Sequence, residues 1–100
     1  MLVPSSAFAA SYPADSVGRL LEGYGDAFRD GWISGYTEAF FMTGGECPIR
    51  VSPRMLLSAL QMHVAAGRIA MTDPDQVGIT QTLGEIGCTH PIGTKNKVAR

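Results

Sequence analysis

The chain has 100 residues, of which 45% are hydrophobic and 17% are charged, and its formal net charge at pH 7 is −1. This composition predicts one ordered domain with a modest core and excludes a second domain. A nearly balanced charge provides neither a basic footprint for nucleic acid nor a polybasic patch for a membrane surface, so we expect a protein partner. No stretch reaches the roughly 18 apolar residues that a transmembrane helix needs.

Residues 1–14 are expected to be a leader. Small residues at Ala7 and Ala9, on either side of Phe8, resemble the A-x-A cleavage region of a secretory signal peptide. The preceding Met1–Pro4 supplies neither a positive region nor a long apolar core, so we expect a truncated signal peptide and a periplasmic protein. A disordered leader of small residues is the alternative.

A helical domain is predicted over residues 15–88, beginning with a helix that Asp15 or Ser16 can cap. Its apolar positions fall at i, i+3, i+4, i+7 and i+11 and predict one continuous face: Val17, Leu20, Leu21, Tyr24 and Phe28. Gly23 and Gly25 weaken this helix in its middle.

A second helix is predicted over roughly 26–42, with Trp32, Tyr36 and Phe40 on one side. This aromatic stripe is wide enough to serve both the core and a homodimer contact. Aromatic residues at helical spacing belong more often to a core, so both roles stay open for these three side chains.

The third helix has the clearest start in the chain, with Ser52 as N-cap and Pro53 at the first helical position. Its apolar stripe is Leu56, Leu57, Leu60 and Val64. Gly67 is the expected stop.

A fourth helix is predicted by the same logic, with Asp73 as cap and Pro74 as first residue. Its apolar positions are Ile79, Leu83 and Ile86. Gly87 ends it, and residues 89–100 carry no apolar period, so we expect them to form a flexible tail.

The chain's two cysteines stand at the base of the hairpin that the third and fourth helices would form. Cys47 precedes the third helix and Cys88 follows the fourth, so the two ends should meet and allow a disulfide. Closing a loop of this size stabilises a fold by about 4 kcal/mol in the chain-entropy model. The expected fold is therefore an all-α, four-helix domain, orthogonal or bundle-like, with one disulfide. Reduced structural thiols are the alternative.

Catalytic and metal-binding roles find little support in the spacing of residues. A cysteine nucleophile would need His63 or His90 as its base and a third group to orient that base, and no such constellation is recognisable. The two cysteines, Cys47 and Cys88, and the two histidines do not form the short paired clusters, such as C-x-x-C, that are typical of zinc sites. We therefore expect a protein that is not an enzyme and that holds no metal or cofactor.

The order of short motifs resembles the Rap/Tai family of immunity proteins. The motifs are Leu20-Leu21 to Tyr24, Gly35-Tyr36, Cys47-Pro48 to Val51-Ser52, and Leu83 to Cys88. The resemblance covers about Val17 to Cys88, most of the chain. Members of the family usually carry four cysteines; Tyr24 and Ile33 stand about where the first pair is expected, and only the later pair is matched here.

The resemblance implies a periplasmic, homodimeric protein that blocks the active site of a type VI secretion amidase toxin by occlusion. The segment expected to bind the toxin is the loop Gly67–Asp73 between the third and fourth helices. Arg68, Ile69, Met71 and Asp73 are its candidate contacts, because Arg and Met are enriched at interface cores. The alternative for Ile69 and Met71 is that they pack beneath the loop.

A broader resemblance leads to a different function. Small helical periplasmic proteins of the Hde-like group also carry a single disulfide and act as acid-stress chaperones. The nine Asp and Glu residues of this chain could couple its fold to pH. A chaperone of this kind should loosen near pH 2 to 3, whereas an immunity protein need not.

Overall fold

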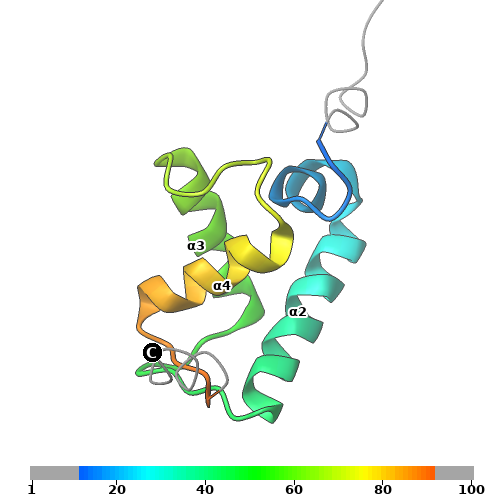
Figure 1. Cartoon of the computed structure of the whole chain (residues 1–100). Helices are drawn as coiled ribbons and strands as arrows, with labels where there is room; N and C mark the ends of the chain where they lie inside the picture. Colours follow the sequence, from blue (N-terminus) through cyan, green and yellow to red (C-terminus); the bar gives the residue numbers. More distant parts are fainter. Residues whose placement is uncertain (1–11, 92–100) are drawn as a thin grey trace, which may run out of the picture.

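The computed structural model describes residues 12–91, and within them it contains helices and isolated bridges but no strand. Four helical elements follow one another: η1 (Arg19–Gly23), α2 (Asp26–Met42), α3 (Pro53–Ala65) and α4 (Asp75–Ile86) (Figure 1). The predicted all-α fold with one disulfide is confirmed. The cleavage-like residues around Phe8 and the tail from residue 92 onward lie outside the described residues.

One apolar core joins all four elements, and α3 packs against both α2 and α4. The buried apolar side chains are Val17, Leu20, Ile33, Val51, Leu56, Leu60, Ile69, Ile79 and Leu83. No helix among the described residues is long and apolar enough to span a membrane.

The first helix is shorter than predicted. η1 is a π-helical stretch that ends at Gly23, and Tyr24 is extended, with φ −103° and ψ 147°. The predicted continuous face from Val17 to Phe28 is therefore wrong, because Phe28 belongs to α2 and is 52% exposed. Gly23 and Gly25 flank the break, where glycine's loss of backbone entropy makes a continuous helix unfavourable.

The predicted start of α3 is confirmed. Ser52 is the N-cap, and its Oγ accepts a hydrogen bond from the backbone N–H of Met55 at 3.1 Å. Pro53 follows as the first helical residue, where its missing N–H removes no helical hydrogen bond. Gly67 lies just past the end of α3 with a positive φ of 80°, which glycine adopts without a side-chain clash.

The start of α4 lies one residue later than predicted. Pro74 is the N-cap and Asp75 the first helical residue. Asp73 does not cap α4, because its Oδ2 accepts the backbone N–H of Ala70 at 3.0 Å inside the preceding loop. Gly87 ends the helix in the left-handed region, with φ 101°, as predicted.

The segment before η1 runs antiparallel to the loop between α3 and α4. The N–H groups of Val17 and Gly18 donate to the carbonyl groups of Asp73 and Met71, at 2.8 and 2.7 Å. A Cβ added to Gly78 would lie 2.6 Å from Cγ2 of Val17. This close approach of the N-terminal segment to α4 therefore requires glycine at position 78.

Contacts with the domain continue past Cys88, where we expected the tail to begin. Thr89 pairs with Glu46 in an antiparallel bridge. The His90 ring lies 5.2 Å from the ring of Phe40, between centroids. The end of α2 and the residues after α4 thus lie side by side.

Candidate protein-binding site

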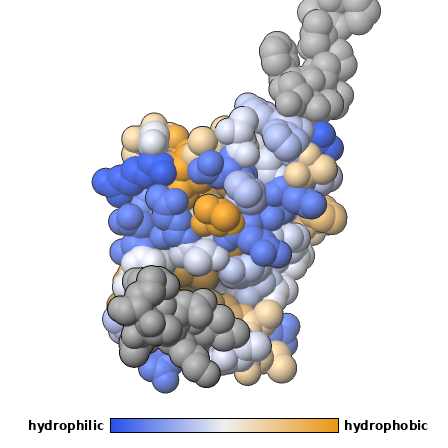
Figure 2. All heavy atoms as spheres, viewed as in Figure 1, coloured by the Kyte–Doolittle hydropathy of each residue, from blue (hydrophilic) through white to orange (hydrophobic). Residues whose placement is uncertain are grey.

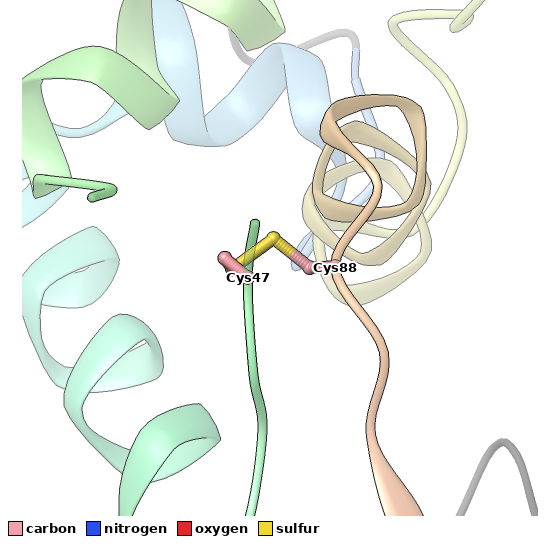
Figure 3. The surroundings of a disulfide bond; sticks show 2 residues. All are labelled: Cys47 and Cys88. Carbon is pink, nitrogen blue, oxygen red and sulfur yellow. A yellow bond between two sulfur atoms is a disulfide. The ribbon is translucent and has the colours of Figure 1, made fainter. Parts of the chain in front are cut away.

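A disulfide between Cys47 and Cys88 closes the base of the α3–α4 hairpin (Figure 3). Glu46 and Thr89 exchange two backbone hydrogen bonds of 2.9 and 2.8 Å. The cysteines form the next pair of this short antiparallel ladder, a position where Cα atoms lie about 4.5 Å apart in sheets. Their Cα atoms are 4.1 Å apart. The base of the hairpin is therefore held by hydrogen bonds as well as by the predicted disulfide.

The tip of the hairpin is the loop between α3 and α4, and Arg68 is its exposed cation. Nη1 of Arg68 lies 3.5 Å from Nδ1 of the buried His63, and the carbonyl oxygen of Arg68 accepts a hydrogen bond from Nε2 of Gln81 at 3.2 Å. No ion pair joins Arg68 to an acidic residue in the part of the chain that the structure describes. No acidic side chain of the described residues therefore neutralises its positive charge.

Ile69 does not belong to the exposed surface of this loop. Its side chain is only 2% exposed and lies in the core with Val17 and Leu60. The prediction that Ile69 contacts a partner is wrong, and the alternative that it packs beneath the loop is correct. The N-terminal segment lies against this loop and forms hydrogen bonds with it. The sequence around Ile69 does not indicate this long-range contact.

Met71 and Asp73 are both half-buried and engaged within the domain. Met71 packs against the core, and its carbonyl accepts the N–H of Gly18. The carboxylate of Asp73 accepts the N–H of Ala70. Of the four predicted contact residues, only Arg68 is exposed, while Asp73 shapes the loop that presents it.

The three α2 aromatic residues are half-buried against the core. The rings of Trp32 and Tyr36 stack with centroids 5.4 Å apart and planes at 19°. The hydroxyl of Tyr36 is 2.7 Å from Oγ1 of Thr80, which ties α2 to α4. Phe40 packs edge-on against Phe41 at 5.2 Å. These side chains therefore contribute to the fold and keep part of their surface exposed.

A groove of about 310 Å³ lies between α2 and the start of α3, and no sequence motif predicted it. Its lining residues are Arg29, Asp30, Ile33, Ser34, Pro53, Arg54 and Leu57. Arg29 forms ion pairs with Asp26 at 3.4 Å and Asp30 at 3.0 Å. Arg54 is exposed and forms no ion pair with the described residues. The groove thus combines the buried Ile33 with the ion-paired Arg29 and Asp30 and with Arg54, which forms no ion pair with the described residues.

Asp75 is the one buried carboxyl group of the described domain. Burial raises its pKa above the ordinary value, and the nearby Asp15 raises it further. A hydrogen bond from the N–H of Gln76 acts in the opposite direction without cancelling the effect. The Asp75 carboxyl is therefore protonated more easily in the folded domain than in the unfolded chain.

The two cysteines are joined to each other, so neither offers a free thiol in this form of the protein. Within residues 12–91, no three His, Cys, Asp or Glu side chains lie close enough together to hold a metal ion. Figure 2 shows hydrophilic residues with hydrophobic ones between them on the face of the molecule that is seen in Figure 1.

Comparison of the chain with protein-family models, with curated proteins and with solved structures found no match.

Proposed function

We propose that this chain is a non-catalytic protein inhibitor that binds another protein through the tip of its α3–α4 hairpin. The observation that carries this proposal is the exposed Arg68 on a loop fixed from two sides. The disulfide holds the base of the hairpin, and the Val17 and Gly18 N–H groups hold the tip. A loop that is already ordered loses less conformational entropy when it binds, which favours affinity.

The proposed target is a type VI secretion amidase toxin acting in the periplasm. The Rap/Tai resemblance of the motifs from Leu20 to Cys88 supports this target class. The disulfide fits an oxidising compartment. Inhibition would proceed by occlusion, with the tip filling the active-site cleft of the toxin, and requires no chemistry from this chain.

The resemblance also implies a homodimer, which forms part of the same proposal. Phe28 and Met42 are 52% and 77% exposed on α2 and offer apolar surface for such a contact. Sedimentation equilibrium should then give twice the monomer mass, and the variant Phe28→Glu should shift the mass toward that of the monomer.

The decisive experiment co-produces this chain in the bacterial periplasm with an amidase toxin encoded next to its gene. Protection from lysis, together with inhibition of peptidoglycan cleavage by the purified chain, is the expected result. Arg68→Gln should weaken inhibition, whereas Gln76→Glu on α4 should not. Both variants lower the net charge by one, so the comparison separates the tip from overall charge. Full toxin activity at saturating inhibitor would reject the proposal.

A further inference from the structure

The segment before η1 is joined to the tip loop and to the start of α4 by a short antiparallel pairing. Ser16 pairs with Pro74 at its centre. On one side of this pair, the N–H groups of Val17 and Gly18 donate to carbonyl groups of the tip loop. We call the two paired segments the N-terminal bridge: residues 15–18 and residues 71–75.

Two aspartates face each other on the other side of the same pair. Because Ser16 and Pro74 are paired antiparallel, the residues next to them, Asp15 and Asp75, are also opposite each other. The N–H of Asp75 donates to the carbonyl oxygen of Asp15 at 2.7 Å. Like charges directly opposite each other destabilise an antiparallel pair. The negative charges of these two side chains therefore oppose the pairing that their backbone groups form.

The two aspartates differ in their surroundings. Asp75 is only 6% exposed, whereas Asp15 is exposed and has a positive φ of 61°, a conformation that Asp and Asn adopt more readily than most residues. Burial raises the pKa of the Asp75 carboxyl, and the charge of Asp15 raises it further. Opening the N-terminal bridge separates the two residues, so the pKa of Asp75 then falls toward its ordinary value.

No cation among the described residues forms an ion pair with Asp75. Three other charged side chains lie in the N-terminal bridge, in the tip loop or directly after the bridge: Arg19, Arg68 and Asp73. In that order, their polar groups contact residues other than Asp75: Tyr12, His63 and Ala70. Asp15 is the charged residue that acts on the Asp75 carboxyl.

We propose that Asp15 and Asp75 make the N-terminal bridge a pH-sensitive contact that holds the tip loop more firmly as the pH falls. This regulation rests on the proposed function for the tip being the binding site. Protonated Asp75 favours the closed bridge, so the stabilisation is complete below the ordinary aspartate pKa of about 3.9. It is lost as the pH rises through the raised pKa that Asp75 has in the closed bridge.

The direction of this effect has a consequence for binding. A loop that is held in place loses less conformational entropy when it binds, so the tip should bind its target more tightly in mild acid than at neutral pH. An acid-stress chaperone would instead loosen on acidification. The N-terminal bridge therefore gives the domain a response to acid of the opposite sign.

The test measures amide hydrogen exchange of the full, disulfide-bonded chain at pH 7 and pH 4. The reporters are the amides of Val17 and Gly18, which donate across the N-terminal bridge. Their protection factors, corrected for the intrinsic exchange rate at each pH, should rise roughly threefold or more between pH 7 and pH 4. Protection that stays constant or falls over this range would overturn the proposal.

Substitutions separate this pair from the general charge of the domain. Asp15→Asn tolerates the positive φ and removes the charge that faces Asp75. It should raise the protection of Val17 and Gly18 at pH 7, weaken the response to pH, and lower the titration midpoint of the Asp75 carboxyl measured by its ¹³C chemical shift. Asp75→Asn should abolish the response to pH.

Glu38→Gln is the matched control, because it removes one negative charge from an exposed position on α2. It should leave the protection of Val17 and Gly18 and the Asp75 midpoint unchanged. Circular dichroism verifies that each variant is folded, and the exposed Asp15 keeps the test available if Asp75→Asn does not fold. Equal effects of Asp15→Asn and Glu38→Gln, or an Asp75 midpoint that Asp15→Asn leaves unchanged, would refute the pairing of these two charges.

This proposal and the proposed function fail in different ways, because exchange is measured on the chain alone. The expected response of Val17 and Gly18 without inhibition of the toxin would support the pH-sensitive contact and reject the proposed function. Inhibition of the toxin, combined with exchange that does not respond to pH, would support the function and overturn the pH-sensitive contact.

Discussion

The contribution of the disulfide can be measured by replacing both Cys47 and Cys88 with Ala. The two cysteines are 41 residues apart in sequence, and the chain-entropy model gives about 4 kcal/mol for closing a loop of that length. A typical domain is stable by only about 5–15 kcal/mol, so the double variant should lose a large part of its stability. Because the Glu46–Thr89 bridge and the packed helices hold the ends together in the folded state, the effect acts chiefly on the unfolded chain.

Urea unfolding of the oxidised protein, the reduced protein and the double variant measures this effect. The urea concentration at the midpoint should fall. The free energy of unfolding should also decrease more steeply with urea concentration, because an unfolded chain without the crosslink exposes more surface. The reduced protein serves as the matched control and should behave like the double variant. A loss below about 1 kcal/mol with an unchanged slope would refute this reasoning, since closing so long a loop should stabilise the fold by more.

Three further substitutions test other parts of the domain. Ser52→Ala removes the N-cap of α3 and should lower the free energy of unfolding by about 0.5–2 kcal/mol, with Ser58→Ala on the exposed face as the near-neutral control. Gly78→Ala places a Cβ 2.6 Å from Cγ2 of Val17 and should cost about 1–3 kcal/mol in urea unfolding; an unchanged midpoint would mean that the N-terminal segment gives way freely. Asp75→Asn tests the raised pKa of the Asp75 carboxyl. Protonation of this carboxyl stabilises the folded state relative to the unfolded chain. The stabilisation is therefore complete below the unfolded pKa of about 3.9 and is lost as pH rises through the folded pKa. Wild type should therefore gain stability relative to the Asn variant between pH 7 and pH 3, and an equal difference at the two pH values would contradict the shift.

Local signals predicted those features of the fold that are decided within a few residues. Ser52 and Pro53 started α3, and Gly87 ended α4, because caps and turns depend on neighbouring side chains and backbone angles. The disulfide also followed from sequence, since Cys47 and Cys88 flank two helices of similar length.

Features decided by contacts between distant segments were predicted poorly. Asp73 has the right chemistry for a helix cap, but its carboxylate bonds to Ala70 inside a loop that the N-terminal segment holds. The sequence left open whether Ile69 contacts a partner or packs beneath the loop, because nothing near it in sequence shows that it shares a core with Val17. The groove beside Arg54 was not predicted, because it is formed by residues of α2 and α3 that no local motif connects.

The hairpin tip and the hairpin base are held by separate interactions. The 12 residues of α4 separate them by roughly 18 Å. The disulfide acts mainly by restricting the unfolded chain, whereas the hydrogen bonds from Val17 and Gly18 act directly on the folded loop. Under the proposed function, reduction should therefore lower the stability of the domain while leaving the affinity of the molecules that stay folded for the target almost unchanged. Under the same proposal, a substitution that loosens the N-terminal segment should instead weaken binding at the tip, because the loop that carries Arg68 would then have to become ordered during binding.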